Sequence, residues 1–154
     1  MDASMFDPNS FLDATFTEPT EKRPPIPAQD YMAQIGEVKA RTWQGKKDPT
    51  KSGIAWDIPL VIDIPADIQA QLGLTMPTIT LTDSVMLDLT DSGTIDQGVG
   101  KNRKLLNYRE AIDMNKKGDV FSARMMQGKL VKVKVTHDLW EGSIVERVGG
   151  VARA

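Results

Sequence analysis

The feature that most constrains the fold of this chain is a two-residue period of apolar side chains. Every even-numbered residue from Ile54 to Ile62 is apolar, and Val131, Val133 and Val135 alternate with lysine and threonine. Side chains of a β-strand point to opposite faces in turn, so this period predicts strands with one buried face. The same reasoning predicts five strands, at residues 31–40, 54–62, 78–89, 131–136 and 144–148.

Two breaks in the pattern indicate how the first two strands meet. At Gly36 the apolar positions change parity, from Ile35 to Val38, and a glycine at such a point predicts a β-bulge or a sharp bend. Pro59 has no amide hydrogen to give to a ladder, so it should lie at an edge or where the partner strand has ended. We therefore expect a strongly curved first strand that forms a hairpin with the second.

Two segments have the pattern of helices. Residues 65–74 fit a short helix, and residues 101–115 fit a longer one in which Leu105, Tyr108 and Ile112 share one face. A β-rich chain with one main helix between its third and fourth strands is typical of the five-stranded Greek-key barrel known as the OB fold. A β-sandwich with one surface helix is the competing architecture.

The N-terminal segment, residues 1–28, has a different character from residues 29–154, which should form the OB-like barrel. Its five prolines exclude a long helix or a central strand and predict an extended arm. Apolar residues at roughly helical spacing predict a short helical turn at 9–15, which docks on its own domain or on a neighbouring subunit. These apolar residues are Phe6, Phe11, Leu12 and Phe16.

Composition argues against catalysis and against a metal centre. The chain has no cysteine and one histidine, His137, which leaves neither a thiol nucleophile nor a histidine-rich metal site. Residues 98–103, Gly-Val-Gly-Lys-Asn-Arg, lack the complete pattern of a nucleotide-hydrolysing loop. We therefore expect a protein that is not an enzyme and uses no metal and no cofactor.

The chain has no apolar run near the ~18 to 20 residues that span a bilayer. Its first ten residues also lack the basic start and apolar stretch of a signal peptide. We expect a cytoplasmic protein without a membrane partner.

The net charge of −2 conceals an uneven distribution, because residues 101–154 hold twelve Lys or Arg against six Asp or Glu. This indicates either a cationic face for a polyanion or merely a solvated helix and edge strand. Binding a nucleic acid strand requires cations that follow phosphates and flat side chains on which bases stack. The candidate residues are Arg41, Trp43, Lys46, Lys47, Lys51, Lys101, Arg103, Lys132, Lys134 and Trp140.

Some of these candidates have a plain structural interpretation as well. The amides and cations at the start of the 101–115 helix could hold a phosphate, or residues 98–103 could form a simple capping loop. Trp43 and Trp140 adjoin cationic loops, but either could be a partly buried plug of the barrel. Both interpretations stay open at the level of sequence.

Several segments resemble one family of proteins. They are Val85–Thr90, Gly98–Arg103, Leu106–Asn115 and Gln127–His137, together with the leader Ile26–Ile35. Through these segments the chain resembles tailed-bacteriophage proteins identified as single-stranded-DNA-binding proteins of the OB fold. The resemblance covers about residues 26–150.

The resemblance implies a non-catalytic protein of phage replication or recombination that binds single-stranded DNA without sequence preference in the host cytoplasm. The alternative is a structural protein of the virion, a capsid-decorating or cementing subunit whose N-terminal arm clasps neighbouring subunits in a homo-oligomer.

Overall fold

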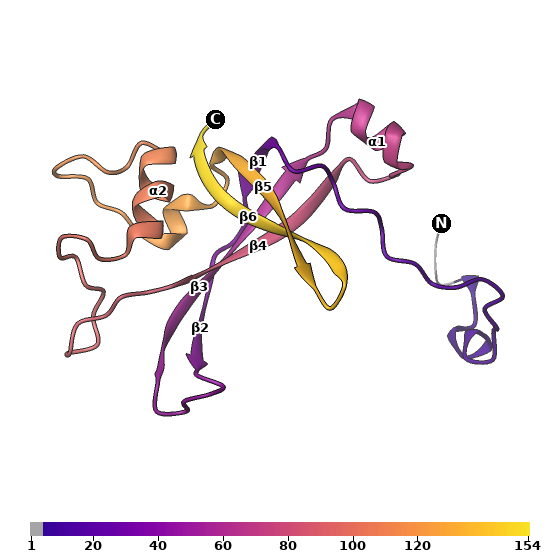
Figure 1. Ribbon diagram of the computed structural model, residues 1–154, viewed down its shortest axis with the longest axis horizontal. Coiled ribbons are helices and arrows are strands. Elements are labelled where there is room, and N and C mark those ends of the chain that lie inside the picture. Colours follow the sequence, from indigo (N-terminus) through magenta and orange to yellow (C-terminus); the bar gives the residue numbers. More distant parts are fainter. Residues whose placement is uncertain (1–4) are drawn as a thin grey trace.

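The computed structural model describes residues 5–154, so the first four residues of the predicted arm lie outside the described residues (Figure 1). Within this range the chain forms one six-stranded antiparallel sheet and two α-helices. The strands are β1 (Asp30–Ile35), β2 (Lys39–Gln44), β3 (Ser52–Asp63), β4 (Thr78–Met86), β5 (Leu130–Trp140) and β6 (Ser143–Arg153). The helices are α1 (Ala66–Leu72) and α2 (Arg103–Ala111), with 3-10 turns η2 (Pro8–Phe11) and η3 (Ala123–Met126).

β1 and β2 are two halves of the predicted curved strand. Both pair with β3, and the register shifts by one residue between the pairs Ile35–Leu60 and Lys39–Asp57. The Gly36 amide donates to the Pro59 carbonyl oxygen at 2.8 Å. Because the nitrogen and carbonyl of a strand residue point to the same side, the Pro59 nitrogen, which has no hydrogen, faces the break between β1 and β2. The predicted bulge at Gly36 and the predicted place of Pro59 are both confirmed.

The sheet differs from the predicted five-stranded barrel in strand count and in closure. The bulge divides the first strand in two, which gives the order β2-β3-β1-β5-β6 with β4 on the other edge of β3. Some Cα atoms of β4 and β6 approach within 8 Å, yet within residues 5–154 no ladder joins the two strands. Arg153 of β6 instead bonds to α2 and the loop after it, through the Glu110 carbonyl oxygen and the Asp113 carboxylate.

α2 covers the core with the face that the helical period predicts. Leu105, Tyr108 and Ala111 are buried, and Ile112 is half-buried against the same cluster. The Tyr108 hydroxyl donates to Asp83 of β4 at 2.7 Å. Burial, reinforced by the Asp83 charge, raises the pKa of Tyr108 far above its usual range. The helix ends before the predicted residue 115 because Asp113 adopts a φ of +58°.

The β5–β6 hairpin turns at Glu141 and Gly142, which both have positive φ. This is the geometry that a two-residue turn between antiparallel strands needs. β6 runs past its predicted end at Val148 to Arg153, because Gly149 is accommodated as a bulge between the pairs Val135–Val148 and Lys134–Gly150. Part of the arm lies along this hairpin. Arg23 forms a bidentate pair with Glu146 at 2.7 and 3.0 Å, and Ile26 is fully buried.

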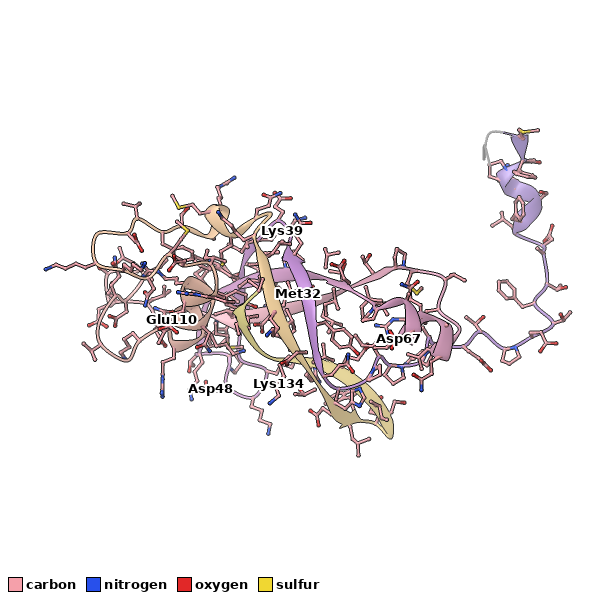
Figure 2. The ribbon with its side chains drawn as sticks, turned by 90° about the horizontal axis from the view of Figure 1, so that it is seen from above. Met32, Lys39, Asp48, Asp67, Glu110 and Lys134 are labelled. Atoms are coloured by element: carbon pink, nitrogen blue, oxygen red, sulfur yellow. The ribbon has the colours of Figure 1, made fainter. Side chains whose placement is uncertain are left out.

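The rest of the arm, residues 5–22, leaves the domain and is exposed throughout (Figure 2). The predicted helical turn is present as η2, although it covers Pro8–Phe11 rather than 9–15. It does not dock on its own domain, since Phe11 and Phe16 are 61% and 84% exposed. The docked part of the arm is therefore the proline-rich stretch that follows Lys22.

Replacing Leu105 with alanine tests the packing of α2. Loss of this buried side chain should lower the free energy of unfolding by about 2 to 4 kcal/mol. The neighbouring Leu106→Ala is the matched control, because Leu106 is 42% exposed and its loss should cost less than about 1 kcal/mol. Urea unfolding of the two variants measures both values; equal losses would mean that the face of α2 is misassigned.

Candidate nucleic-acid interface

The hairpin formed by β2 and β3 carries half of the predicted nucleic-acid-binding residues. Arg41 and Trp43 lie on β2, while Lys46, Lys47 and Lys51 lie in the turn after it. The hairpin projects from the body of the sheet (Figure 1). Its turn is closed by the Gly45 amide, which donates to the Lys51 carbonyl oxygen at 2.8 Å. All three lysines are exposed, and none forms an ion pair within the described part of the chain.

Trp43 lies across its cross-strand partner Gly53. A Cβ added to Gly53 would stand 2.9 Å from Trp43 Nε1, so only glycine lets the indole approach the backbone this closely. Trp43 is half-buried, and its Nε1 is buried without a hydrogen-bond partner among the described residues. Packing against Gly53 therefore sets the position of the ring, whose exposed part is available for stacking.

Arg41 is less free than the lysines of the turn. Its Nε donates to Asp57 of β3 at 2.9 Å, and Asp57 also accepts from the Ser84 hydroxyl at 2.6 Å. The hydrogen bond from Ser84, and after it the Arg41 guanidinium, hold the pKa of Asp57 below its usual range against the opposing effect of burial. Asp57 is therefore ionised at neutral pH and already partly neutralises Arg41.

Three other predicted residues lie on β5. Lys132 and Lys134 stand exposed on its outer face, opposite Met32 and Asp30 of β1 (Figure 2). Trp140 is 63% exposed at the turn into β6, and its six-residue separation from Lys134 along the strand corresponds to about 20 Å. The structure does not assign either tryptophan the role of a barrel plug, because Trp140 is exposed and Trp43 lies on the outer face of its strand pair.

Lys101 and Arg103 lie at the start of α2, where the loop is held as a cap. Asn102 adopts a φ of +53° and bonds reciprocally with Asp88: the Asp88 amide donates to Asn102 Oδ1 at 2.8 Å, and the Asn102 amide donates to Asp88 Oδ2 at 2.6 Å. The Asp88 carboxylate thus already accepts a hydrogen bond from the Asn102 amide at the start of α2. This favours the capping-loop interpretation of residues 98–103.

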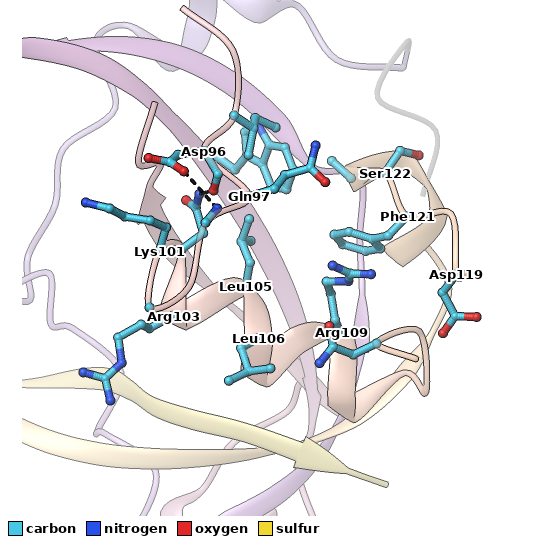
Figure 3. Close-up of a pocket in the computed structure, with 17 residues that line it drawn as sticks. Asp96, Gln97, Lys101, Arg103, Leu105, Leu106, Arg109, Asp119, Phe121 and Ser122 are labelled. Atoms are coloured by element: carbon cyan, nitrogen blue, oxygen red, sulfur yellow. Dashed lines mark hydrogen bonds between the residues drawn. The ribbon is translucent and has the colours of Figure 1, made fainter. Parts of the chain in front are cut away.

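A cavity of about 570 Å³ lies beside α2 and was not anticipated from the sequence (Figure 3). It is walled by Trp56 and Phe121, and the Arg109 guanidinium lies 5.0 Å from the centre of the Phe121 ring. Trp56 belongs to the even-numbered apolar period of β3, which predicts a buried side chain. It is half-buried, packs against the core and also lines this cavity. Residues 119–123 have no periodic pattern, so nothing in the sequence placed Phe121 here.

Among residues 5–154, no three His, Asp or Glu side chains come together as a metal site. No helix in the same range is long and apolar enough to cross a membrane. In comparisons with known proteins, no protein-family model and no curated protein matches the chain.

Replacing Gly53 with alanine tests the packing contact between the Trp43 ring and the Gly53 backbone. The added methyl group meets the indole at 2.9 Å and should cost about 1 to 3 kcal/mol of stability through overpacking. In a Trp43→Ala background the same change should cost much less, a coupling of about 0.5 to 3 kcal/mol in a double-mutant cycle by urea unfolding. Gly150→Ala is the control, because a Cβ there meets nothing within 4 Å. Additive losses at positions 43 and 53 would contradict the contact.

Proposed function

We propose that this protein binds single-stranded DNA without sequence preference, as a non-catalytic protein of phage replication or recombination. The observation that carries the proposal is the β2–β3 hairpin, where a half-buried tryptophan lies beside three exposed lysines that have no carboxylate partner within residues 5–154. These are the two components of sequence-independent strand binding: stacking on a flat ring and attraction between cations and the phosphate backbone.

The topology supports the same proposal. A curved first strand pairs with the second through both its halves and with the fourth through its first half, and α2 stands between the third and fourth. β6 returns beside β4, where an OB barrel closes. We propose that the sheet is an OB-like barrel with an open seam, a fold whose second and third strands bind oligonucleotides.

The ten predicted residues contribute unequally to this proposal. The turn lysines and Trp43 form its centre, and Arg41 contributes less because Asp57 already pairs with it. Lys132 and Lys134 extend the cationic surface onto β5. Trp140 lies at the end of β5, and Lys101 and Arg103 line the cavity beside α2. These three residues lie outside the hairpin turn, so they would bind only a strand that continues over the domain.

The exposed arm favours a second candidate, a structural role in the virion. Residues 5–22 carry three exposed phenylalanines and contact little of their own domain. Such a segment suits a subunit that clasps its neighbours in a capsid lattice. The two candidates differ in their ligand, nucleic acid or protein, and therefore in the experiment that detects it.

Titration of oligothymidine by tryptophan fluorescence, at several salt concentrations, tests strand binding. In Lys46→Glu/Lys47→Glu the loss of two phosphate contacts should flatten the slope of log affinity against log salt by about 1.4. Trp43→Ala should weaken binding by about 1 to 3 kcal/mol for the stacked base and leave the slope nearly unchanged. Charge and stacking thus give separate signatures.

Lys116→Glu/Lys117→Glu is the matched control, because it makes the same charge change in the loop after α2 and should leave the affinity nearly unaltered. Lys132→Glu/Lys134→Glu reports whether the outer face of β5 joins the interface. No binding of oligothymidine by the wild-type chain at low salt would remove this proposal in favour of the virion role.

A further inference from the structure

The cavity beside α2 combines apolar walls with cations that form no ion pair among residues 5–154. Trp56, Leu105 and Phe121 supply apolar surface, and Lys101, Arg103 and Arg109 lie around it (Figure 3). None of the three cations forms an ion pair with any residue of the described chain. Two carboxylates also line the cavity, Asp96 and Asp119, and each accepts a backbone amide of its own loop.

A ligand that suits this cavity needs flat apolar groups with negative charge close to them. The volume of about 570 Å³ lies within the range of clefts that take small ligands or a few side chains. Arg109 over the Phe121 ring shows that guanidinium and aromatic groups already meet in its wall. An acidic peptide with aromatic side chains has both required properties.

The N-terminal arm of this chain has that chemistry. Residues 5–22 contain four carboxylates against one lysine, and Phe6, Phe11 and Phe16 stand exposed among them. Phe6 and Phe11 pack edge to face with ring centres 6.2 Å apart, so η2 presents a small aromatic cluster. Exposed aromatic groups of this number on a short segment mark a binding element.

We propose that the acidic, aromatic arm of one copy docks in the cavity beside α2 of a second copy. The arm is fixed to its own domain at Arg23 and Glu146, and beyond that point it extends away from the domain, on the side opposite α2 (Figure 1). A neighbouring copy, rather than the same chain, therefore meets its aromatic groups. The proposal does not depend on DNA binding.

The contact has a defined geometry at the level of assembly. Each copy offers one arm and one cavity, which are different surfaces, so two copies either exchange arms reciprocally or associate head to tail. Head-to-tail contacts build rings or open chains, and reciprocal exchange stops at a dimer. Either outcome makes the sedimentation coefficient depend on protein concentration.

Sedimentation velocity of the full-length chain, without nucleic acid, tests the proposal. The wild type should associate, and Phe11→Ala/Phe16→Ala should weaken the association roughly tenfold or more, as expected for aromatic anchors. Lys101→Glu/Arg103→Glu, on the rim of the cavity, should weaken it as well. Lys132→Glu/Lys134→Glu is the control for net charge and should associate like the wild type.

A mixing experiment identifies the partners. Asp13→Lys/Glu18→Lys reverses charges on the arm, and these residues are exposed, so the domain remains folded. A mixture of this variant with Lys101→Glu/Arg103→Glu should associate more strongly than either variant alone, because one reversed arm then meets one reversed cavity.

Three results would overturn the proposal. The first is a wild-type chain that stays monomeric at every concentration. The second is an association that the cavity variant leaves unchanged. The third is a Lys101→Glu/Arg103→Glu variant that sediments like the wild type but no longer binds oligothymidine. That result would make the cavity a nucleic-acid-binding site.

Discussion

The sheet depends on how one strand, β3, is shared. β4 pairs along one edge of β3, and β1 and β2 divide the other edge at the bulge, where the Gly36 amide meets the Pro59 carbonyl oxygen. On the N-terminal side of the bulge, β1 pairs with β5 and contributes to the buried core. On its C-terminal side, β2 forms the projecting hairpin with β3. A glycine and a proline at one point thus separate the part of the chain that supplies stability from the part that carries the candidate interface.

The hairpin has two faces with different roles. Trp43 and its partner Gly53 lie on the outer face, whereas Trp56, an odd number of residues along β3, lies on the opposite face and lines the cavity beside α2. The proposed strand-binding surface and the proposed docking site for the arm therefore share one structural element without sharing its side chains.

The strands, the bulge and the buried face of α2 followed from the sequence because each leaves a local mark: a period of two, a parity change at Gly36, or a period near 3.6. Closure of the barrel left no such mark, because it depends on pairing between β4 and β6, which are far apart in the sequence.

Contacts between residues distant in the sequence were missed for the same reason. No sequence pattern links Asp88 to Asn102, yet the two residues form reciprocal hydrogen bonds. Arg109 and Phe121 likewise meet across an irregular segment. The sequence identified the charged turn of the hairpin. The pairing of Arg41 with Asp57 could not be predicted, because it depends on the register between β2 and β3.

We propose that this protein contacts single-stranded DNA through the β2–β3 hairpin. Backbone amide chemical-shift mapping of the full-length chain, with and without oligothymidine at low salt, tests it most directly. The largest shifts should fall between Arg41 and Gly53, with Trp43 Nε1 among them. Shifts confined to α2 or to the β5–β6 hairpin, or no shifts at all, would contradict it.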